Sequence, residues 1–258
     1  MIAITAYSFV WIMLVRAILG RNPIRNAFFY SPLAIALVSH SLWCFEVFRT
    51  PNGYVFSFYQ VASLFFWVMN VLVAMSALQK PLKNLFLILI PLTLIAFFIG
   101  SVFDTEKALA TSMSATIVSH ILLSVIAYSL LTIATLQGLL MMYQYRKLKS
   151  KHPGGLIGIL PPLQTMEKLM FELVGVGFLL LSLSIFSGLL FIEDMFAQHL
   201  VHKTVFSIFS WFIYVVILFG RFYSGWQGIQ AIRWLMAGFV TLMLAYFGSK
   251  LVLEVILA

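Results

Sequence analysis

Residues 84–103 read NLFLILIPLTLIAFFIGSVF, a stretch of the length of one membrane span without a single charged side chain. A helix needs about 20 apolar residues to cross a bilayer, so this stretch predicts a membrane-spanning helix. The whole chain shares this character: 62% of its 258 residues are hydrophobic, 9% are charged, and the mean hydropathy is +1.04. Roughly a quarter of the residues in a soluble domain are charged. The composition therefore excludes a soluble globular enzyme and predicts a protein that lies almost wholly in lipid.

Seven further apolar runs of similar length predict seven further spans. The eight predicted spans lie near residues 2–19, 28–46, 56–78, 84–103, 115–143, 169–192, 204–220 and 234–257. We therefore expect an all-α fold, a polytopic transmembrane helical bundle in which residues 1–258 form a single integral-membrane domain. The first run follows no basic region and precedes no cleavage site, so we expect a retained span rather than a removed signal peptide.

Basic residues are concentrated in alternate connections between the predicted spans. The formal net charge of +8 comes mainly from the first, third, fifth and seventh connections, whereas most acidic residues fall in the second, fourth and sixth. Cytoplasmic loops of membrane proteins are enriched in Lys and Arg. This alternation predicts that both termini lie on the outer side of the membrane. It also accounts for the positive charge without nucleic acid as a partner, because no basic patch with interleaved aromatic residues is present.

The fifth connection has a character of its own. Residues 144–168 are first basic and then rich in Pro and Gly, which predicts a strip that lies on the cytoplasmic surface of the membrane.

The sequence carries no motif for conventional catalysis. Its single cysteine, Cys44, excludes an internal disulfide, a CxxC redox pair and a thiolate zinc cluster. We find no Walker loop, no HExxH motif, and no Ser/His/Asp grouping with an oxyanion hole. We therefore expect a protein that binds, with no catalytic residues.

Four of the five histidines fall on the predicted outer side. His40 lies six residues from the outer end of the second predicted span and His120 five residues into the fifth, while His199 and His202 lie in the outer connection nearby. Ionisable groups inside spans are costly and often functional, and imidazoles on facing helices can ligate haem iron or another transition metal. A buried histidine can equally well hydrogen-bond a neighbouring hydroxyl or carbonyl. Both interpretations are open at this stage.

One face of the fifth predicted span carries most of its polar and small residues. Helical spacing places these on one stripe: Thr116, His120, Ser124, Ala127, Tyr128, Thr135 and Gly138. Such a stripe is typical of a helix face that packs into a bundle. We therefore expect His120 to point toward the interior.

The last third of the chain carries a pattern of separate positions. Ser187-Gly188-Leu189-Leu190 closes the sixth predicted span, and Lys203, Trp211, Tyr214 and Arg221 follow at fixed spacing. Together with His120, these residues resemble the cytochrome c assembly family, which includes the CcsA, CcmC and HemX types. The resemblance is strongest over 115–250 and points to a small type from the bacterial inner membrane. It implies haem as the cofactor, with His120 as an axial ligand.

The chain also departs from the pattern of this family. Haem-handling members carry a tryptophan-rich WWD stretch before the lysine that Lys203 matches, but residues 189–202 contain no tryptophan. Phe219 occupies the position of the family's intramembrane histidine. The family's second external histidine would lie near Leu257, where this chain has none. His202 and His40 are then the outward histidines available as a second haem ligand.

The resemblance implies a haem-handling or accessory protein of cytochrome c biogenesis that binds haem on the periplasmic side of the bacterial inner membrane. We expect the iron to be held by His120 together with His202 or His40. The alternative is a haem-free scaffold that packs against another inner-membrane protein or a transporter. A third option is a transporter of a small hydrophobic or metal-linked substrate, for which Glu172 and Lys250 are the residues to test.

Overall fold

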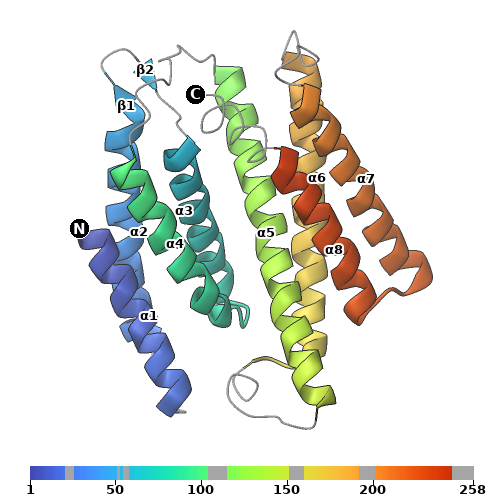
Figure 1. Ribbon diagram of the computed structural model, residues 1–258, viewed down its shortest axis with the longest axis horizontal. Helices are drawn as coiled ribbons and strands as arrows, with labels where there is room; N and C mark the ends of the chain where they lie inside the picture. The colour runs from blue at the N-terminus through green and yellow to red at the C-terminus, as the bar shows by residue number, and fades with distance from the viewer. Residues whose placement is uncertain are drawn as a thin grey trace. The chain divides into compact units, whose positions relative to one another are not determined.

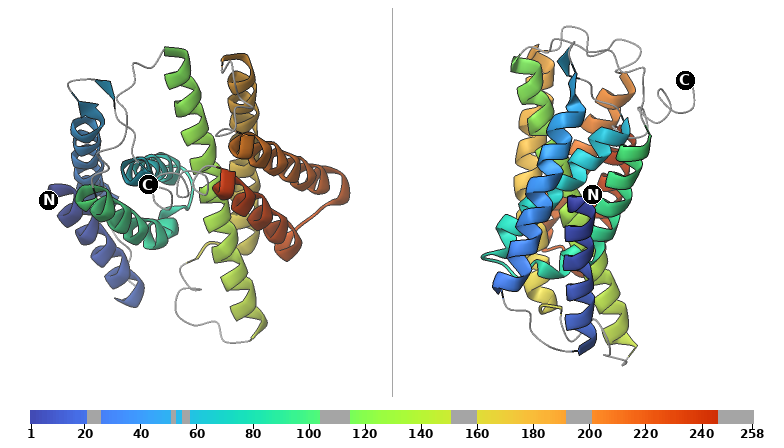
Figure 2. Two further views of the ribbon diagram at one scale, coloured as in Figure 1. Left: turned by 45° about the horizontal axis from the view of Figure 1, so that its top comes forward. Right: turned by 90° about the vertical axis from the view of Figure 1, so that its left-hand side faces the viewer.

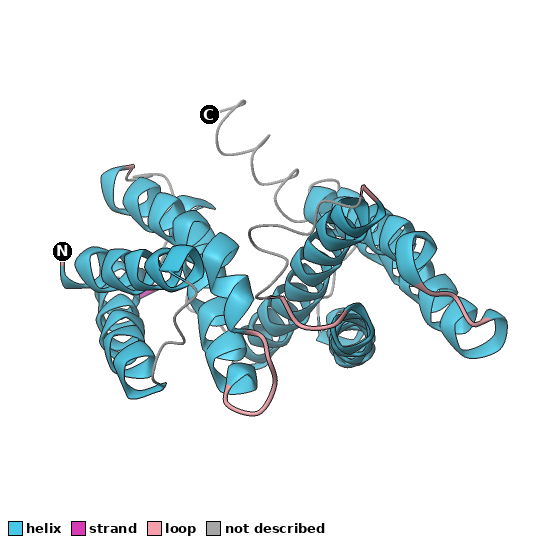
Figure 3. Cartoon of the chain, turned by 90° about the horizontal axis from the view of Figure 1, so that it is seen from below, coloured by secondary structure: helices cyan, strands magenta, loops and turns pink. Residues whose placement is uncertain are grey.

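The computed structural model describes residues 1–20, 26–50, 53–54, 58–103, 115–150, 160–191 and 201–245. Nearly all of these residues are helical, as the cyan ribbon of Figure 3 shows. The helices are α1 (Ile2–Gly20), α2 (Asn26–Phe48), α3 (Phe58–Ala77), α4 (Phe86–Val102), α5 (Ala115–Lys149), α6 (Leu163–Phe191), α7 (Val201–Ser224) and α8 (Gly228–Met243), with a short 3-10 turn, η1 (Lys83–Leu85), before α4. The predicted all-α class is confirmed.

Most of these helices can cross a membrane. Within the described residues, six are long and apolar enough: those in α2, α3, α4, α5, α6 and α7. Two shorter apolar helices, Ile2–Ala17 and Gly228–Met243, accompany them. The chain is therefore a multi-pass membrane protein.

Several predicted boundaries were wrong around the fifth connection. The prediction ended a span at 143 and began the next at 169, whereas α5 continues to Lys149 and α6 begins at Leu163. The predicted surface strip over 144–168 is thus helical at both ends, and residues 151–159 lie outside the described part of the chain. The prediction treated charge as the end of a helix, but basic residues in a last turn favour the helix terminus electrostatically. Pro161 and Pro162 immediately precede α6, in keeping with the tolerance of proline at helix starts.

The last helix also begins earlier than predicted. α8 starts at Gly228 instead of 234. Gly228 takes a left-handed conformation with φ of 57°, which glycine adopts at no steric cost. The second half of the predicted span, residues 246–257, lies outside the described residues. A pair of two-residue strands, β1 (Arg49–Thr50) and β2 (Gly53–Tyr54), lies between α2 and α3 and was not predicted.

The chain divides into two compact units, which are described separately. The first unit contains α1 to α4, in which α1 packs against α2 and α4, and α3 packs against α2 and α4. Its core is largely aliphatic and aromatic, with Tyr7, Phe29, Leu33, Met69 and Phe86 among its fully buried side chains. The prediction of a single domain over the whole chain stays a prediction.

The second unit contains α5 to α8. Its most extensive contact joins α5 and α6, which run side by side in Figures 1 and 2. Gly177 of α6 packs against the Leu131 side chain of α5, from which a Cβ atom at position 177 would lie 2.8 Å. α8 packs against α5 and α7. In Figure 1, α5 and α7 begin at the same end of this unit at which α6 finishes. We call this end, marked by His120, the His120 end.

Candidate functional site

Polar side chains of α5 meet hydroxyl groups of α6 and α7 inside the second unit. His120 Nδ1 lies 2.9 Å from Ser187 Oγ, and Ser124 Oγ lies 2.7 Å from Ser184 Oγ. One turn further along α5, Tyr128 Oη lies 3.5 Å from Ser207 Oγ of α7. Along α5, the His120 imidazole is therefore the member of this row of polar groups that lies nearest to the start of the helix.

The imidazole of His120 is held on one side only. It is half-buried, and its Nδ1 atom bonds to Ser187, whose own hydroxyl donates to the Ser184 carbonyl at 2.8 Å. Among the described residues, no hydrogen bond to its Nε2 atom is found. A half-buried imidazole nitrogen with no partner is a suitable ligand for a transition metal or haem iron.

A second polar group lies deeper along the same interior. Tyr214 of α7 is fully buried, and its hydroxyl oxygen has no hydrogen-bond partner among the described residues. Its ring packs against the backbone of Gly238, where a Cβ atom would lie 3.2 Å from the tyrosine ring. Ser210, one turn earlier, donates to the Gly238 carbonyl at 2.8 Å. α7 and α8 are thus held together just below the row of hydroxyl groups.

The predicted inward stripe of α5 is confirmed. Ala127 is fully buried, Thr135 is nearly so, and Gly138 packs against side chains of α6 and α8. His120 and Ser124 lie on this stripe with partners on α6. The side chain of Thr116 lies outside the described part of the structure.

His40 lies in the first unit and is hydrogen-bonded at both ring nitrogens. Tyr7 Oη lies 3.3 Å from Nδ1, and Ser63 Oγ lies 3.0 Å from Nε2. The imidazole is completely buried and makes edge contacts with the rings of Tyr7, Trp43 and Phe97. These contacts match the structural interpretation of a buried histidine, which satisfies its polar atoms with neighbouring hydroxyls.

The other predicted ligand lies at the edge of what the structure describes. His202 is the second residue of α7, so its backbone lies at the His120 end, but its side chain and the whole of His199 are outside the described residues. Cys44, one turn from His40, is buried and unpaired with another cysteine. In the described ranges no group of three or more His, Cys, Asp or Glu side chains could hold a metal ion.

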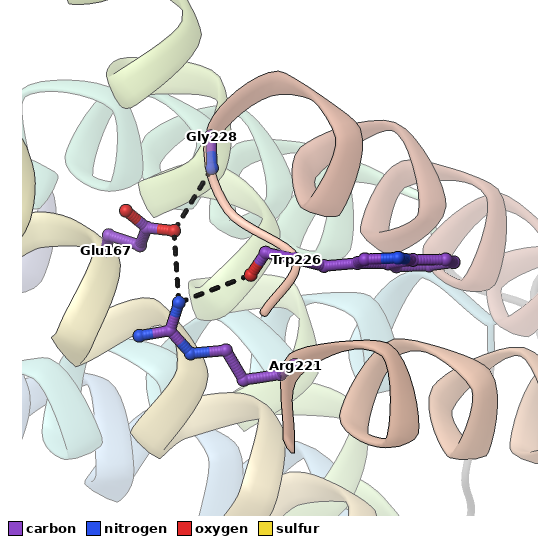
Figure 4. Close-up of polar contacts among 4 residues, drawn as sticks. All are labelled: Glu167, Arg221, Trp226 and Gly228. Carbon is purple, nitrogen blue, oxygen red and sulfur yellow. Dashed lines mark hydrogen bonds and ion pairs between the residues drawn. The ribbon is translucent and has the colours of Figure 1, made fainter. Parts of the chain in front are cut away.

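A second ordered cluster joins α6, α7 and α8 at the opposite end of the second unit. Figure 4 shows the guanidinium of Arg221 and the backbone nitrogen of Gly228 approaching the same oxygen of Glu167, at 3.6 and 3.1 Å. Arg221 also donates to the Trp226 carbonyl at 3.2 Å and lies over the Phe171 ring at 4.6 Å. Glu167 was not predicted as part of a site, because the sixth span was expected to begin at 169.

The residues that carried the resemblance occupy defined places on α7. Trp211 donates to Ser182 Oγ of α6 at 2.8 Å, Tyr214 is buried, and Arg221 is ion-paired. Comparison with known families gives a match between residues 29–257 and the model of the cytochrome C assembly proteins. The chain belongs to the cytochrome c assembly protein family. The expected resemblance is thereby confirmed over most of the chain.

Curated relatives of this cytochrome c assembly chain fall into two groups: those that match over most of its length and those that match over only part of it. The inner membrane protein YpjD of Escherichia coli (strain K12) is 29% identical over 259 residues, which cover 99% of this chain and 98% of YpjD. An uncharacterized 28.8 kDa protein of Azospirillum brasilense is 29% identical over 90% of this chain and 88% of its own. The cytochrome c biogenesis protein CcsA of Gloeobacter violaceus is 29% identical over only 33% of this chain and 26% of its own. No solved structure matches this chain.

Proposed function

We propose that this protein handles haem as part of cytochrome c biogenesis, on the periplasmic side of the bacterial inner membrane. Its membership in the cytochrome c assembly family supports the role, and the full-length likeness to an E. coli inner membrane protein supports the location. The observation that carries the proposal is the His120 imidazole, which is fixed through Nδ1 and has no hydrogen bond at Nε2 among the described residues.

The distribution of charge supports the orientation. Arg146, Lys147 and Lys149 end α5, and Arg221 lies in the last turn of α7. Both groups lie at the end of the second unit opposite His120. Because Lys and Arg accumulate on the cytoplasmic side, the His120 end faces outward. With α1 and the apolar run that starts in α8 counted as spans, the bundle has eight spans and both termini lie outside.

In the proposed site His120 Nε2 would hold the haem iron, because histidine is a ligand of haem iron in globins and cytochromes. Bound haem would supply the iron centre that an assembly pathway delivers to its apocytochrome. His202 is the proposed second ligand because its backbone lies at the same end of the unit. His40 is the weaker candidate, since binding iron would first break its contact with Tyr7 or Ser63.

In this account the protein binds and presents haem without making or breaking bonds in it. We propose no enzymatic step, in keeping with the lack of a conventional catalytic motif in the sequence. Membrane lipid surrounds the bundle, whose outward helix faces carry large apolar side chains such as Phe186, Phe209 and Phe212.

A haem-free scaffold is the second candidate function, and particular residues favour it. Residues 189–202 contain no tryptophan. By the family resemblance, haem-handling members carry a histidine at the position of Phe219 and another near Leu257, where this chain has none. In that case the same bundle serves as a subunit that packs against another inner-membrane protein.

Absorbance spectroscopy of the purified protein separates the two candidates. The protein in detergent is mixed with haemin, and the unbound haemin is removed. The Soret band is then recorded for the wild type and for His120→Ala. A Soret band in the wild type that is weakened in the variant supports haem handling. A colourless wild type that co-purifies with a stoichiometric membrane protein would contradict it and favour the scaffold.

A further inference from the structure

A chain of two hydrogen bonds runs from the His120 imidazole to the backbone of α6. His120 Nδ1 lies 2.9 Å from Ser187 Oγ, and Ser187 Oγ donates to the Ser184 carbonyl oxygen at 2.8 Å. The second bond links residues three apart in one helix, so the fold of α6 sets its geometry. Ser187 therefore presents its oxygen to His120 from a fixed position.

The direction of these bonds follows from simple chemistry. A carbonyl oxygen only accepts, and a serine hydroxyl has one proton to donate. With the Ser187 proton donated to the Ser184 carbonyl, the Ser187 oxygen accepts from His120, and Nδ1 carries the imidazole proton. In a neutral imidazole only one nitrogen is protonated. Nε2 is then left with its lone pair free.

The surroundings of His120 reinforce this arrangement. The backbone of Ser184 also lies beside the imidazole, and Ser124 Oγ donates to the His120 carbonyl at 2.8 Å. The neighbouring hydroxyl of Ser124 is engaged in this way and with Ser184. Ser187 of α6 thus holds the Nδ1 edge of the ring.

We propose that Ser187 is the positioning residue of this site: it fixes His120 as the Nδ1-protonated tautomer and orients Nε2 as the ligating nitrogen. The inference about the tautomer stands without haem, whereas its role in ligation rests on the proposed function. Partners of this kind, which hold the second nitrogen of a ligating histidine, typically change metal affinity by about 10- to 100-fold when removed.

The first test measures the tautomer directly in the haem-free protein. The full chain is labelled with 15N-histidine, and its ring nitrogens are observed by NMR well above the ordinary histidine pKa of about 6.5. The spectrum of His120→Ala assigns the His120 signals. In the wild type we expect a protonated Nδ1 and an unprotonated Nε2. A wild-type His120 protonated mainly at Nε2 would overturn the proposal.

Two serine variants and one control complete this test. Ser187→Ala should give a mixture of tautomers, whereas Ser187→Thr, which keeps the hydroxyl, should restore the wild-type pattern. Ser182→Ala removes another α6 hydroxyl, the partner of Trp211, and should leave the His120 signals unchanged. An unaltered His120 in Ser187→Ala would refute the role of Ser187.

The second test asks whether the fixed tautomer matters for ligation. Haemin is titrated into the same variants and followed at the Soret band. Ser187→Ala should bind about 10-fold or more weakly, and Ser187→Thr and Ser182→Ala should bind as the wild type does. Equal affinity in Ser187→Ala would contradict a positioning role. If the wild type binds no haem, the proposed function fails, while the NMR result still decides the tautomer.

Discussion

Arg221 of α7 and Glu167 of α6 are joined by an ion pair with 3.6 Å between Nη1 and Oε1. The same carboxylate oxygen accepts the backbone N–H of Gly228, the first residue of α8. One acidic side chain therefore links three helices at the end opposite His120. This linkage gives Arg221 a structural role at that end of the second unit.

This linkage predicts energetic coupling between the two residues. Glu167 and Arg221 are 16% and 32% exposed at their side chains, so the pair is partly shielded from water. In a double-mutant cycle of Glu167→Ala and Arg221→Ala we expect a coupling of about 1 kcal/mol, the upper end for pairs near a surface. The free energy of unfolding in detergent measures it. Arg233→Ala is the control, because this exposed arginine should change stability by less than about 0.5 kcal/mol. Additive effects of the two alanine substitutions would contradict the linkage.

Trp226, in the turn after α7, packs against Gly220. We therefore predict that position 220 tolerates no side chain. A Cβ atom there would collide with the Trp226 ring, whose backbone N–H closes the helix end on the Gly220 carbonyl at 2.9 Å. Gly220→Ala should destabilise the protein by about 1–3 kcal/mol. Gly175→Ala is a matched control in α6, because its Cβ would meet nothing within 4 Å. Gly175→Ala should be neutral or mildly stabilising. Thermal unfolding of both proteins provides the comparison, and equal midpoints would refute the contact.

The contacts of His40 predict a structural role that is separate from haem. Replacing it with leucine leaves the buried hydroxyls of Tyr7 and Ser63 without this partner, at a cost of about 1–3 kcal/mol for each unsatisfied group. His40→Leu should therefore unfold at a lower denaturant concentration while its Soret spectrum with haemin matches the wild type. A stable variant that has lost haem binding would instead place His40 among the ligands.

The proposed orientation predicts the location of the C-terminus. Alkaline phosphatase fused after Ala258 should be active, because this enzyme works only outside the cytoplasm, and green fluorescent protein at the same place should be dark when exported unfolded. A fusion after Lys149, at the basic end of α5, is the control and should give the reverse pattern. A fluorescent C-terminal fusion would contradict the proposed location of the C-terminus outside the cytoplasm.

The apolar runs predicted the helices well because a segment within lipid must form all of its backbone hydrogen bonds internally, as a helix does. The boundaries failed where hydropathy carries no signal: the charged turns of α5 and α6 are still helical, so Glu167 was missed. The inward face of His120 followed from spacing along one helix. Its partner Ser187 could not be predicted, because that pairing depends on how α5 and α6 align. Nor could hydropathy distinguish His40 from His120, since the difference is that hydroxyls of other helices engage both nitrogens of His40.

Replacement of the proposed ligand with rescue by free imidazole is the most direct test of the central claim, that His120 Nε2 binds haem iron. The affinity for haemin is measured at the Soret band for the wild type and for His120→Gly, with and without added imidazole. We predict that the glycine variant binds about 10-fold or more weakly and that imidazole restores the wild-type spectrum. A His120→Gly protein that binds haemin as tightly as the wild type, or a wild type that binds none, would contradict it.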